Sequence, residues 1–504
     1  MRSNLLSNGR WAITVAALSL GVVALLFVKG LGGAGIATPQ SPSPEATVDP
    51  QVYAPLVMKE HSVSPQLLPF SLTGIQISWV EDRDGDQDEA WRAREAGARW
   101  LRSYICWSGI EPVKTSSRTY NWTPYDTKFN NMAEDSTNVI AILGCNPSWA
   151  AQYPGGPVTD TVDLTDFLSA AVERYDGDGV DDAPGHPRVG YWELYNEPDL
   201  EDESRAGSGG IGFWGKDGAG YAQMLHAVYP AIKGADPTAQ VVFGGVAYED
   251  VGYFNLDFVD DVMTYIEYNP DDYFDIMNFH YFPNFAIRWK SWGIDIVGKA
   301  TRLREIMANH GISKPMICTE AGDWSWPPWD WRTASHETQS RYVVQLYVRS
   351  MATHLDTAIW YQLIDCRDDC PGEEKRGLFD PDRNRKPSYN AYRTLATRLA
   401  GASYERTLTA GELDSDKAEG YVLVVPRASK RIYVVWTTQE DATATLRIPA
   451  SEAVVYDKYD PSILTVPPVT PFDPYTVRDG DDGAADGHVS ISYGPSPVHV
   501  EVSL

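Results

Sequence analysis

The sequence predicts an α/β fold: a (β/α)8 barrel of eight parallel strands, followed by an antiparallel β-sandwich. Between residues 70 and 400, short apolar runs alternate with helix-like stretches, and this alternation favours a parallel sheet. Eight such runs suit a closed barrel with some long loops. Over residues 401–504 the helix-like stretches stop and strand-like runs remain, which favours a sandwich. An open doubly wound sheet is the alternative, but no Gly-x-Gly-x-x-Gly follows any strand.

The N-terminus has the pattern of a targeting segment. Two arginines precede an apolar run from Trp11 to Val28, so residues 1–37 are predicted to be a signal peptide or a membrane anchor. Residues 38–69 are rich in Pro and Ser and are predicted to be a linker. We therefore expect an extracellular protein, secreted or anchored to the outer face of the cytoplasmic membrane.

Eight apolar runs are the predicted strands of the barrel, and the clearest helices lie between them. The strands are Phe70–Val80, Arg99–Cys106, Asn138–Gly144, Val189–Tyr195, Gln240–Gly244, Phe274–Tyr281, Pro315–Thr319 and Thr357–Gln362. The helices include Glu89–Ala96, Leu164–Tyr175, Tyr221–Lys233, Ile296–Asn309 and Glu337–Thr353.

Five further apolar runs, with turns and no helix between them, are the predicted strands of the sandwich. They are Gly420–Pro426, Arg431–Thr437, Ala442–Ile448, Ala453–Tyr456 and His488–Tyr493. This part of the chain carries no catalytic group of residues that we recognise, so a structural role is expected.

The composition limits the classes of partner. The 504 residues carry a formal net charge of -27, and the isoelectric point is about 4.7. Nucleic acid is excluded as an expected partner, because phosphate binding needs a basic face. Aromatic residues make up 12% of the chain. Flat aromatic faces stack on sugars and also fill cores, so this fraction alone does not decide between the two.

The five cysteines do not form the framework of a disulfide-rich domain. Cys106, Cys145 and Cys318 lie in apolar runs and are expected to be buried free thiols. Cys366 and Cys370 bracket a short loop and could pair in an exported protein, which leaves this pairing open.

Two glutamates end predicted strands of the barrel. Glu197 follows the fourth strand and Glu320 follows the seventh. The carboxyl ends of barrel strands meet at one face, where barrel enzymes carry their active sites. A pair of carboxyl groups in different environments is the arrangement that glycoside hydrolysis requires. Glu193 is a second candidate for the acid, and a buried ion pair with a barrel arginine is its alternative role.

Four features of the barrel occur together. They are the second-strand stretch Arg102–Pro112, the tripeptide Asn196-Glu197-Pro198, Glu320, and Trp360 in the eighth strand. Together they resemble the clan A glycoside hydrolases, and families 39 and 5 are the most similar. These are retaining enzymes on (β/α)8 barrels, and several families carry a C-terminal sandwich.

The resemblance implies a retaining glycosidase that cleaves β-glycosidic bonds of oligo- or polysaccharides by double displacement. Glu197 would be the acid/base and Glu320 the nucleophile. Asn196 would bind the sugar 2-hydroxyl, and Arg102 would hold Glu320 ionised. Carbohydrate is the expected partner, and the resemblance implies no metal or other cofactor for catalysis.

The sixth strand departs from the pattern of these families. They usually carry a His and, two positions later, a Tyr that bonds the nucleophile, whereas this chain has His280-Tyr281-Phe282. Strand alternation places His280 and Phe282 on one face and Tyr281 on the other. His280 is expected at the site. Tyr281 either turns inward at a bulge and contacts substrate, or packs under a helix.

Further strand-end and loop residues are candidates for sugar binding. A cluster of tryptophans in the loop after Glu320 suggests stacking platforms, with a self-packed loop as the alternative. The additional candidates for substrate binding are Trp107, Asn146, Trp324, Trp326 and Trp360.

One acidic loop before the fourth strand has the residue types of a calcium site. Asp176, Asp178, Asp181 and Asp182 offer alternating carboxylates, which suit a hard cation. The loop lacks the full twelve-residue spacing with a terminal Glu, so a solvated turn is the alternative.

Two other functions fit the same residues. A transglycosylase would use both acids and differ only in how well water competes for the intermediate. A non-catalytic carbohydrate-binding surface protein would keep the barrel and the aromatics, but it has no need of both glutamates with Asn196 and Arg102.

Overall fold

The computed structural model describes residues 72–77, 89–134, 137–153, 156–201, 214–249, 253–284, 287–326, 334–366, 375–462 and 471–504. The targeting segment and linker predicted over residues 1–69 lie outside these ranges, so both stay predictions. Within the described ranges, no helix combines the length and the apolar character needed to cross a membrane.

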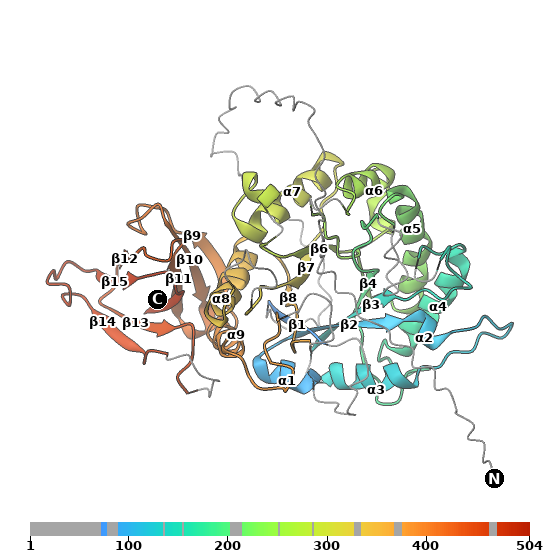
Figure 1. Ribbon diagram of the computed structural model, residues 1–504, viewed down its shortest axis with the longest axis horizontal. Coiled ribbons are helices and arrows are strands. Elements are labelled where there is room, and N and C mark those ends of the chain that lie inside the picture. Colours follow the sequence, from blue (N-terminus) through green and yellow to red (C-terminus); the bar gives the residue numbers. More distant parts are fainter. Residues whose placement is uncertain are drawn as a thin grey trace, which may run out of the picture.

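Eight parallel strands form the first domain, and their order follows the chain around a ring (Figure 1). Strand β1 pairs with both β2 and β8, and the remaining neighbours follow in sequence to β5 and β6. Isolated parallel bridges from Val242 to Ile276 and from Val246 to Phe279 join the β5 and β6 sides. The strands are β1 (Thr73–Gln76), β2 (Trp100–Cys106), β3 (Asn138–Gly144), β4 (Tyr191–Leu194), β5 (Gln240–Val242), β6 (Met277–Tyr281), β7 (Met316–Ala321) and β8 (Ala358–Trp360). The predicted (β/α)8 barrel is thus confirmed, and the open sheet is ruled out.

Helices follow the strands and surround the barrel, as the alternation of apolar runs and helix-like stretches in the sequence predicts. They are α1 (Glu89–Ala96), α2 (Trp107–Ile110), α3 (Thr123–Met132), α4 (Thr161–Arg174), α5 (Gly218–Ala235), α6 (Phe258–Ile266), α7 (Asp295–Asn309), α8 (His336–Ala352) and α9 (Pro387–Arg398). Several begin at clear caps. The Asp160 side chain accepts the Val162 N–H at the start of α4, and Ser335 and Thr338 form a capping box at α8. Short 3₁₀ turns complete the described helices, at Pro270–Asp272, Ile287–Ser291 and Pro426–Ala428.

The interior of the barrel is layered. Buried apolar side chains from successive strands fill its lower part: Trp100, Ile140, Tyr191, Val242, Ile276, Ile317 and Ile359. Residues two positions further along a strand point to the same face. Arg102 therefore lies above Trp100, and Glu193 lies above Tyr191. The apolar layer thus becomes the floor of a polar layer at the carboxyl ends of the strands.

The second domain is an antiparallel sandwich, as predicted. One sheet has six strands in the order β14-β13-β16-β11-β10-β9, and β12 pairs with β15 opposite it. The strands are β9 (Ser403–Thr407), β10 (Ala418–Val425), β11 (Lys430–Thr437), β12 (Ala444–Ile448), β13 (Glu452–Asp457), β14 (Tyr475–Arg478), β15 (Val489–Tyr493) and β16 (Val498–Ser503). Their inward side chains, among them Val435, Leu446 and Val500, form a separate core.

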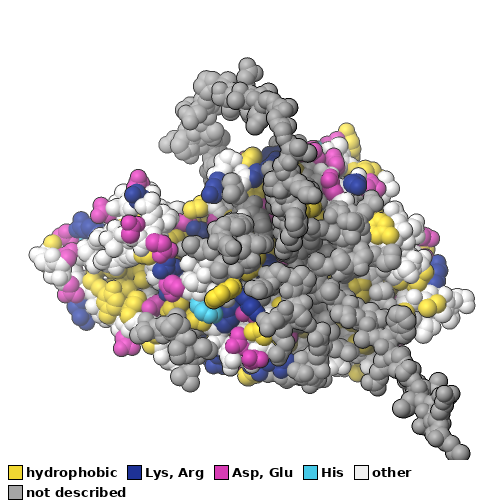
Figure 2. All heavy atoms as spheres, in the orientation of Figure 1, with side chains coloured by type: hydrophobic (Ala, Val, Ile, Leu, Met, Phe, Trp, Pro, Cys, Tyr) yellow, Lys and Arg dark blue, Asp and Glu magenta, His cyan; other side chains and the backbone are white. Residues whose placement is uncertain are grey.

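The sandwich lies beside α8 and α9 of the barrel (Figure 1). Arg349 of α8 forms a two-pronged ion pair with Glu419 of β10, with Nε–Oε1 2.8 Å and Nη2–Oε2 2.7 Å. Trp436 of β11 packs into the same apolar cluster as the barrel helices. Over the described part of the face in Figure 2, acidic and basic side chains are interspersed.

One disulfide corrects the expectation for two of the cysteines. Cys106 and Cys145 are bonded to each other, with Cα atoms 4.9 Å apart, whereas Cys318 is a buried free thiol as expected. Cys106 ends β2, and Cys145 directly follows its neighbour β3, so the barrel brings them together. Cys366 is disulfide-bonded, while Cys370 lies outside the described residues.

Candidate functional site

The polar layer at the carboxyl ends of the strands is centred on Arg102 of β2. Its side chain is fully buried, and its guanidinium donates in four directions. It bonds both oxygens of Glu193 at 2.7 Å, Oε1 of Glu320 at 2.7 Å and Oδ1 of Asn196 at 2.8 Å. It also donates to Gln76 of β1. One cation thus fixes side chains from β1, β4 and β7 and from the loop after β4.

Glu197 lies directly after β4 on a backbone that few residue types favour. Its φ is 47°, and its N–H donates to the Gly245 carbonyl at 2.9 Å. The bond to Gly245 ties the loop after β4 to the loop after β5. The Glu197 residue is only 7% exposed. Positive φ costs free energy outside glycine, and such positions gather at functional sites.

Glu320 enters the site from β7 at an irregularity of the sheet. Around Thr319, the pairing register shifts both between β7 and β6 and between β7 and β8. The Glu320 residue is 5% exposed. One oxygen of Glu320 and one oxygen of Glu197 lie within 4.8 Å of each other.

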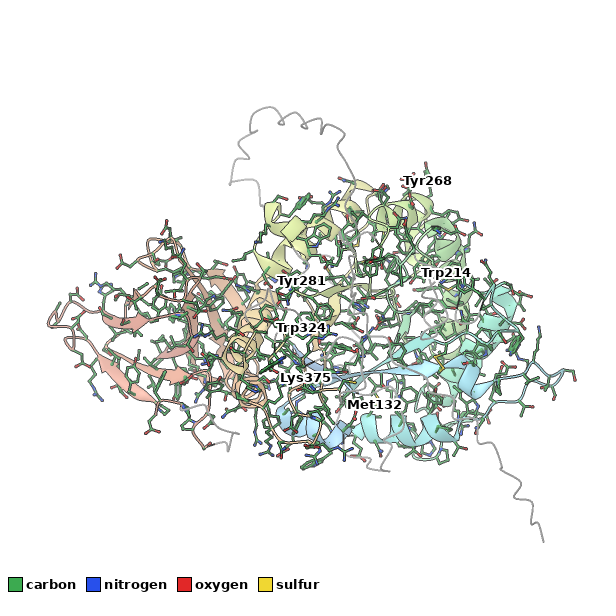
Figure 3. All side chains as sticks on the ribbon, in the orientation of Figure 1. Met132, Trp214, Tyr268, Tyr281, Trp324 and Lys375 are labelled. Carbon is green, nitrogen blue, oxygen red and sulfur yellow. A yellow bond between two sulfur atoms is a disulfide. The ribbon has the colours of Figure 1, made fainter. Side chains whose placement is uncertain are left out.

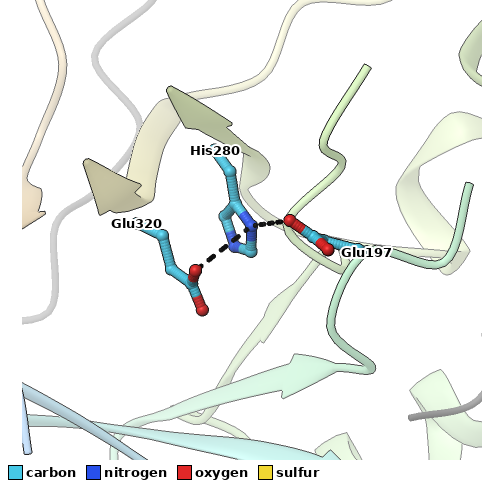
Figure 4. Close-up of side chains that lie close together, drawn as sticks. All are labelled: Glu197, His280 and Glu320. Atoms are coloured by element: carbon cyan, nitrogen blue, oxygen red, sulfur yellow. Dashed lines mark hydrogen bonds and ion pairs between the residues drawn. The ribbon is translucent and has the colours of Figure 1, made fainter. Parts of the chain in front are cut away.

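His280 of β6 lies between the two glutamates (Figure 4). Its Nδ1 is 3.1 Å from Glu197 Oε1 and 3.8 Å from Glu320 Oε2. Its Nε2 is 3.4 Å from Nη2 of Arg102, which can only donate, so the neutral ring carries its hydrogen on Nδ1. Burial lowers the pKa of His280 well below its usual value, and the positive charges of Arg102 and Lys299 add to this. His280 is thus a neutral donor facing two carboxyl groups.

The two glutamates have different electrostatic surroundings. Burial raises the pKa of Glu197 well above its usual value, and the charges of Glu320 and Asp199 raise it further. Burial also raises the pKa of Glu320, but the adjoining Arg102 guanidinium opposes that rise. Arg102 thus favours the ionised form of Glu320, but burial outweighs it, and the expectation that Arg102 holds Glu320 ionised stays a prediction. When the pair shares one proton, Glu197 holds it.

Glu193 takes the second of its two expected roles. It is fully buried, and both of its oxygens bond Arg102. Oε1 also accepts from Thr319 Oγ1 at 3.2 Å and from the Gly245 N–H at 3.1 Å. This arrangement makes it a structural counter-ion of Arg102.

Four predicted substrate-binding residues do not face the site. Tyr281 is buried in the outer core, where Asp295 of α7 raises its pKa further after burial. Trp360 is fully buried, and its Nε1 donates to the Arg376 carbonyl at 2.9 Å. Both rings are on the helix side of their strands, because strand alternation leaves their neighbours to face inward.

Trp107 and Asn146 are the other two corrections. Trp107 is fully buried, stacks on Phe167 at 5.1 Å and donates from Nε1 to Glu111 at 2.9 Å. The amide of Asn146 bonds the Gly156 carbonyl and the Tyr195 hydroxyl. The indole ring and the amide therefore hold the protein together and present no free face or donor to a sugar.

The two tryptophans after β7 differ from each other. Trp324 is 2% exposed and packs near Phe282, with ring centroids 6.1 Å apart, so its predicted role as an open platform is wrong. Trp326 is 61% exposed and stays a predicted stacking residue. The remaining two tryptophans of that cluster lie within residues 327–333, outside the described ranges.

Three site residues escaped the sequence reading. Gln76 of β1 bonds Arg102. Tyr104 lies two residues after Arg102 on the same face of β2, and the charges of Glu320 and Glu193 contribute to raising its pKa, after burial. That spacing was the signal that could have identified it. Arg376 lies near Glu320 and lowers the pKa of that carboxyl. Nothing in the sequence around Arg376 indicates this position.

Among the residues that the structure describes, two groups could hold a metal ion. Glu197, His280 and Glu320 offer atoms within 4.8 Å of one another, but the Arg102 cation occupies one oxygen of Glu320. Asp176, Asp178 and Asp182 form the second group, which does not include Asp181. Burial and the neighbouring carboxylates raise the pKa of Asp176 to about 6. Calcium binding there stays a prediction.

Comparison with known proteins places the fold. No family model and no curated protein sequence matches the chain. A family 39 glycoside hydrolase from the gut symbiont Bacteroides cellulosilyticus is similar in structure, with a TM-score of 0.62 and 18% identity over 86% of this chain and 81% of that chain. A family 39 enzyme from Xanthomonas axonopodis pv. citri has a TM-score of 0.58 and 17% identity over 86% and 94% of the two chains. A monomeric β-xylosidase from Caulobacter crescentus has a TM-score of 0.56 and 16% identity over 86% and 96%. The chain therefore has the fold of clan A glycoside hydrolases.

The close approach of Gly245 to His280 gives a test of the site's packing. A Cβ at Gly245 would lie 2.2 Å from His280 Nε2 and 2.9 Å from Thr319 Oγ1. Gly245→Ala should therefore lower the free energy of unfolding by about 1–3 kcal/mol, as overpacking does. Urea denaturation followed by tryptophan fluorescence measures the change.

Gly234→Ala in the last turn of α5 is the matched control. A Cβ at Gly234 would meet no described atom within 4 Å, so this change should be neutral or stabilising by about 0.5–1 kcal/mol. Equal denaturation midpoints for Gly245→Ala and the wild type would show that His280 can move away freely, against the packing described here.

Proposed function

We propose that the chain is a retaining glycoside hydrolase that cleaves β-glycosidic bonds of oligo- or polysaccharides. The observation that carries this proposal is the pair Glu197 and Glu320, whose nearest-facing oxygens lie within 4.8 Å. Retaining glycosidases hold their two carboxyl groups about 5–5.5 Å apart, whereas inverting enzymes leave about 6.5–9.5 Å for a water. The short spacing supports direct attack by a carboxylate.

The surroundings of the two glutamates support one assignment of roles. Glu197 Oε1 lies 3.1 Å from Nδ1 of a neutral His280, and burial raises the pKa of Glu197 well above its usual value, so it suits the proton donor. Glu320 bonds the Arg102 cation at 2.7 Å, which favours the ionised form needed in a nucleophile. Two carboxyl groups with different environments are what this chemistry requires.

In the first step, a Glu320 oxygen forms a bond to the anomeric carbon of the sugar. The bond from that carbon to the leaving oxygen breaks, and Glu197 gives its proton to the leaving oxygen. The proposed products of this step are a glycosyl ester of Glu320, an ionised Glu197 and the departing alcohol. The His280 Nδ1–H, 3.1 Å from Glu197 Oε1, is placed to stabilise the new charge on Glu197.

In the second step, ionised Glu197 takes a proton from a water molecule whose oxygen attacks the anomeric carbon. The ester bond breaks, and both glutamates return to their starting states. Asn196 is the proposed partner of the sugar 2-hydroxyl. The Arg102 guanidinium donates to Oδ1 of Asn196 at 2.8 Å. This bond fixes which end of the Asn196 amide faces Arg102 and leaves the amide nitrogen to donate to the sugar.

The class of substrate rests on the structural neighbours. One is a β-xylosidase, one an endoxylanase of family 30 and one a glucosidase from Croceicoccus marinus. These enzymes share the fold at 18% identity or less, so they support a carbohydrate substrate without choosing the sugar, and the β-xylosidase supports a β-linkage.

We also propose that the barrel works outside the cytoplasm. The disulfide between Cys106 and Cys145 supports an oxidising compartment, in addition to the apolar N-terminal run. Cell fractionation of the host should find the protein outside the cytoplasm or on its membrane. Intact protein with reduced Cys106 and Cys145 in the cytoplasmic fraction would contradict the proposal.

Separate substitutions of the two glutamates test the assignment. Glu320→Ala should lose nearly all activity on every glycoside, because no nucleophile remains. Glu197→Ala should lose about 10²–10⁴-fold on a natural saccharide, the usual contribution of general acid catalysis. It should still form the glycosyl-enzyme from an activated aryl glycoside, whose leaving group needs no proton. Azide should then release a glycosyl azide of retained configuration.

Glu193→Gln is the control for this series, because it removes a buried carboxylate that does not have the acid role. Its loss of rate should be the same for activated and natural substrates, and azide should not restore it. Near wild-type rates of both Glu197→Ala and Glu320→Ala on a saccharide would leave a non-catalytic carbohydrate-binding protein. Excess transfer product with an added sugar acceptor would indicate a transglycosylase.

A further inference from the structure

Arg376 is a buried cation held among three aromatic rings. Its residue is only 2% exposed, although it lies in the loop after β8. The guanidinium carbon lies 4.6 Å from the ring centroid of Phe282, 4.8 Å from that of Trp324 and 4.5 Å from that of Tyr361. A cation within about 6 Å of an aromatic centroid is attracted by the ring, most strongly where water is excluded. Three such rings fix where this charge lies.

The rings come from the strand ends that surround Glu320. Phe282 directly follows β6, two residues after His280. Trp324 lies four residues after Glu320 in the chain. The Tyr361 N–H donates to the Ala321 carbonyl at 2.7 Å, next to Glu320 in sequence. Phe282, Trp324 and Tyr361 thus form an aromatic cage around Arg376, and this cage is part of the same barrel mouth as the two glutamates.

The backbone around Arg376 is fixed as well. Its carbonyl accepts from Trp360 Nε1 at 2.9 Å. Gln339 of α8 donates to the carbonyls on both sides, Lys375 at 3.3 Å and Gly377 at 3.4 Å. The Ser325 N–H donates to the Lys375 carbonyl at 2.8 Å, which joins the loop after β7 to the loop that carries Arg376. Trp324 and Lys375, the neighbours of these two residues, are labelled in Figure 3. Trp360 and Gln339 thus serve the loop that carries Arg376.

The charge of Arg376 reaches the Glu320 carboxyl. Among the opposing influences on the pKa of Glu320, burial raises it, and the cations of Arg102 and then Arg376 lower it. The groups that face Glu320 come from several elements of the barrel. They are Arg102 and Tyr104 of β2, Glu193 of β4, Glu197 after β4, His280 of β6 and Arg376 after β8.

We propose that Arg376 is a positioning residue for the nucleophile: the aromatic cage presents its guanidinium as a second cationic partner of Glu320. This rests on the proposed role of Glu320. Phe282 has no hydroxyl group with which to bond the carboxylate, and its ring instead packs against the Arg376 guanidinium. Arg102 is shared with Glu193, whereas Arg376 acts on Glu320 from the loop after β8.

Ionisation of Glu320 in the resting protein tests the proposal without depending on activity. Protein with 13C-labelled glutamate carboxyl groups is titrated by NMR, and the Glu320 signal is assigned by its loss in Glu320→Gln. Arg376→Met should raise the pKa of Glu320, because a cation that favours the charged form is gone. Arg376→Lys keeps a cation and should return the pKa most of the way to the wild-type value.

Lys375→Met is the matched control, because it removes the neighbouring cation on the same loop. Lys375 donates to the Cys366 carbonyl at 3.1 Å, and its charge is not among the main influences on Glu320. The Glu320 titration should be unchanged in this variant. Phe282→Leu, which removes one ring face and keeps an apolar side chain, should raise the pKa in the same direction and by less.

The pH dependence of kcat/KM on an aryl glycoside gives the second readout. Its acidic limb reports the ionised nucleophile of the free enzyme. The limb should move to higher pH in Arg376→Met and recover in Arg376→Lys. A Glu320 titration that is identical in the wild type and in folded Arg376→Met would overturn the proposal. Absence of glycosidase activity in the wild type, with the NMR shift present, would overturn the proposed function and leave the role of Arg376 toward Glu320 intact.

Discussion

A fully buried guanidinium lies at the centre of the barrel mouth, and the surrounding structure compensates its charge. Arg102 bonds Glu193 with both oxygens and Glu320 with one, each at 2.7 Å. A buried ion pair is stable only where its remaining bonding capacity is filled, and removal of one partner typically costs about 3–5 kcal/mol. Gln76 and Asn196 fill that capacity here. The positions of four strand ends therefore depend on a single side chain.

The same cation makes the two glutamates unequal. Glu320 bonds Arg102, and this cation opposes the rise in the pKa of Glu320 that burial causes. Glu197 instead faces a neutral His280, and burial raises its pKa well above the usual value. Because the two carboxyl groups lie so close, they titrate as a pair. When the pair holds one proton, that proton is on Glu197. An arginine inside the barrel that bonds one glutamate and not the other can in this way keep an acid and a base side by side.

Much of the fold and the placement of the two glutamates could be predicted from the sequence, because the pattern of apolar residues indicates where strands lie and where they end. The barrel, the sandwich and the elements that carry Glu197 and Glu320 follow from apolar runs and the polar residues after them. Side-chain direction was less secure. Strand alternation alone favours packing of Tyr281 under a helix, the second of its two expected roles, and the structure has it there. The direction of Trp360 was predicted wrongly, because a one-residue difference in register reverses the face of every side chain. Contacts between distant segments, such as Cys106 with Cys145, require the strand order as well.

The central claim is that Glu320 becomes covalently attached to the sugar. Incubation with an activated 2-deoxy-2-fluoro-β-glycoside slows the breakdown of such an intermediate, and intact mass spectrometry followed by peptide mapping locates the adduct. The account predicts one added glycosyl group on the peptide that contains Glu320, and none in Glu320→Ala. Hydrolysis of natural substrate to a product of inverted anomeric configuration, with no adduct at Glu320, would contradict it.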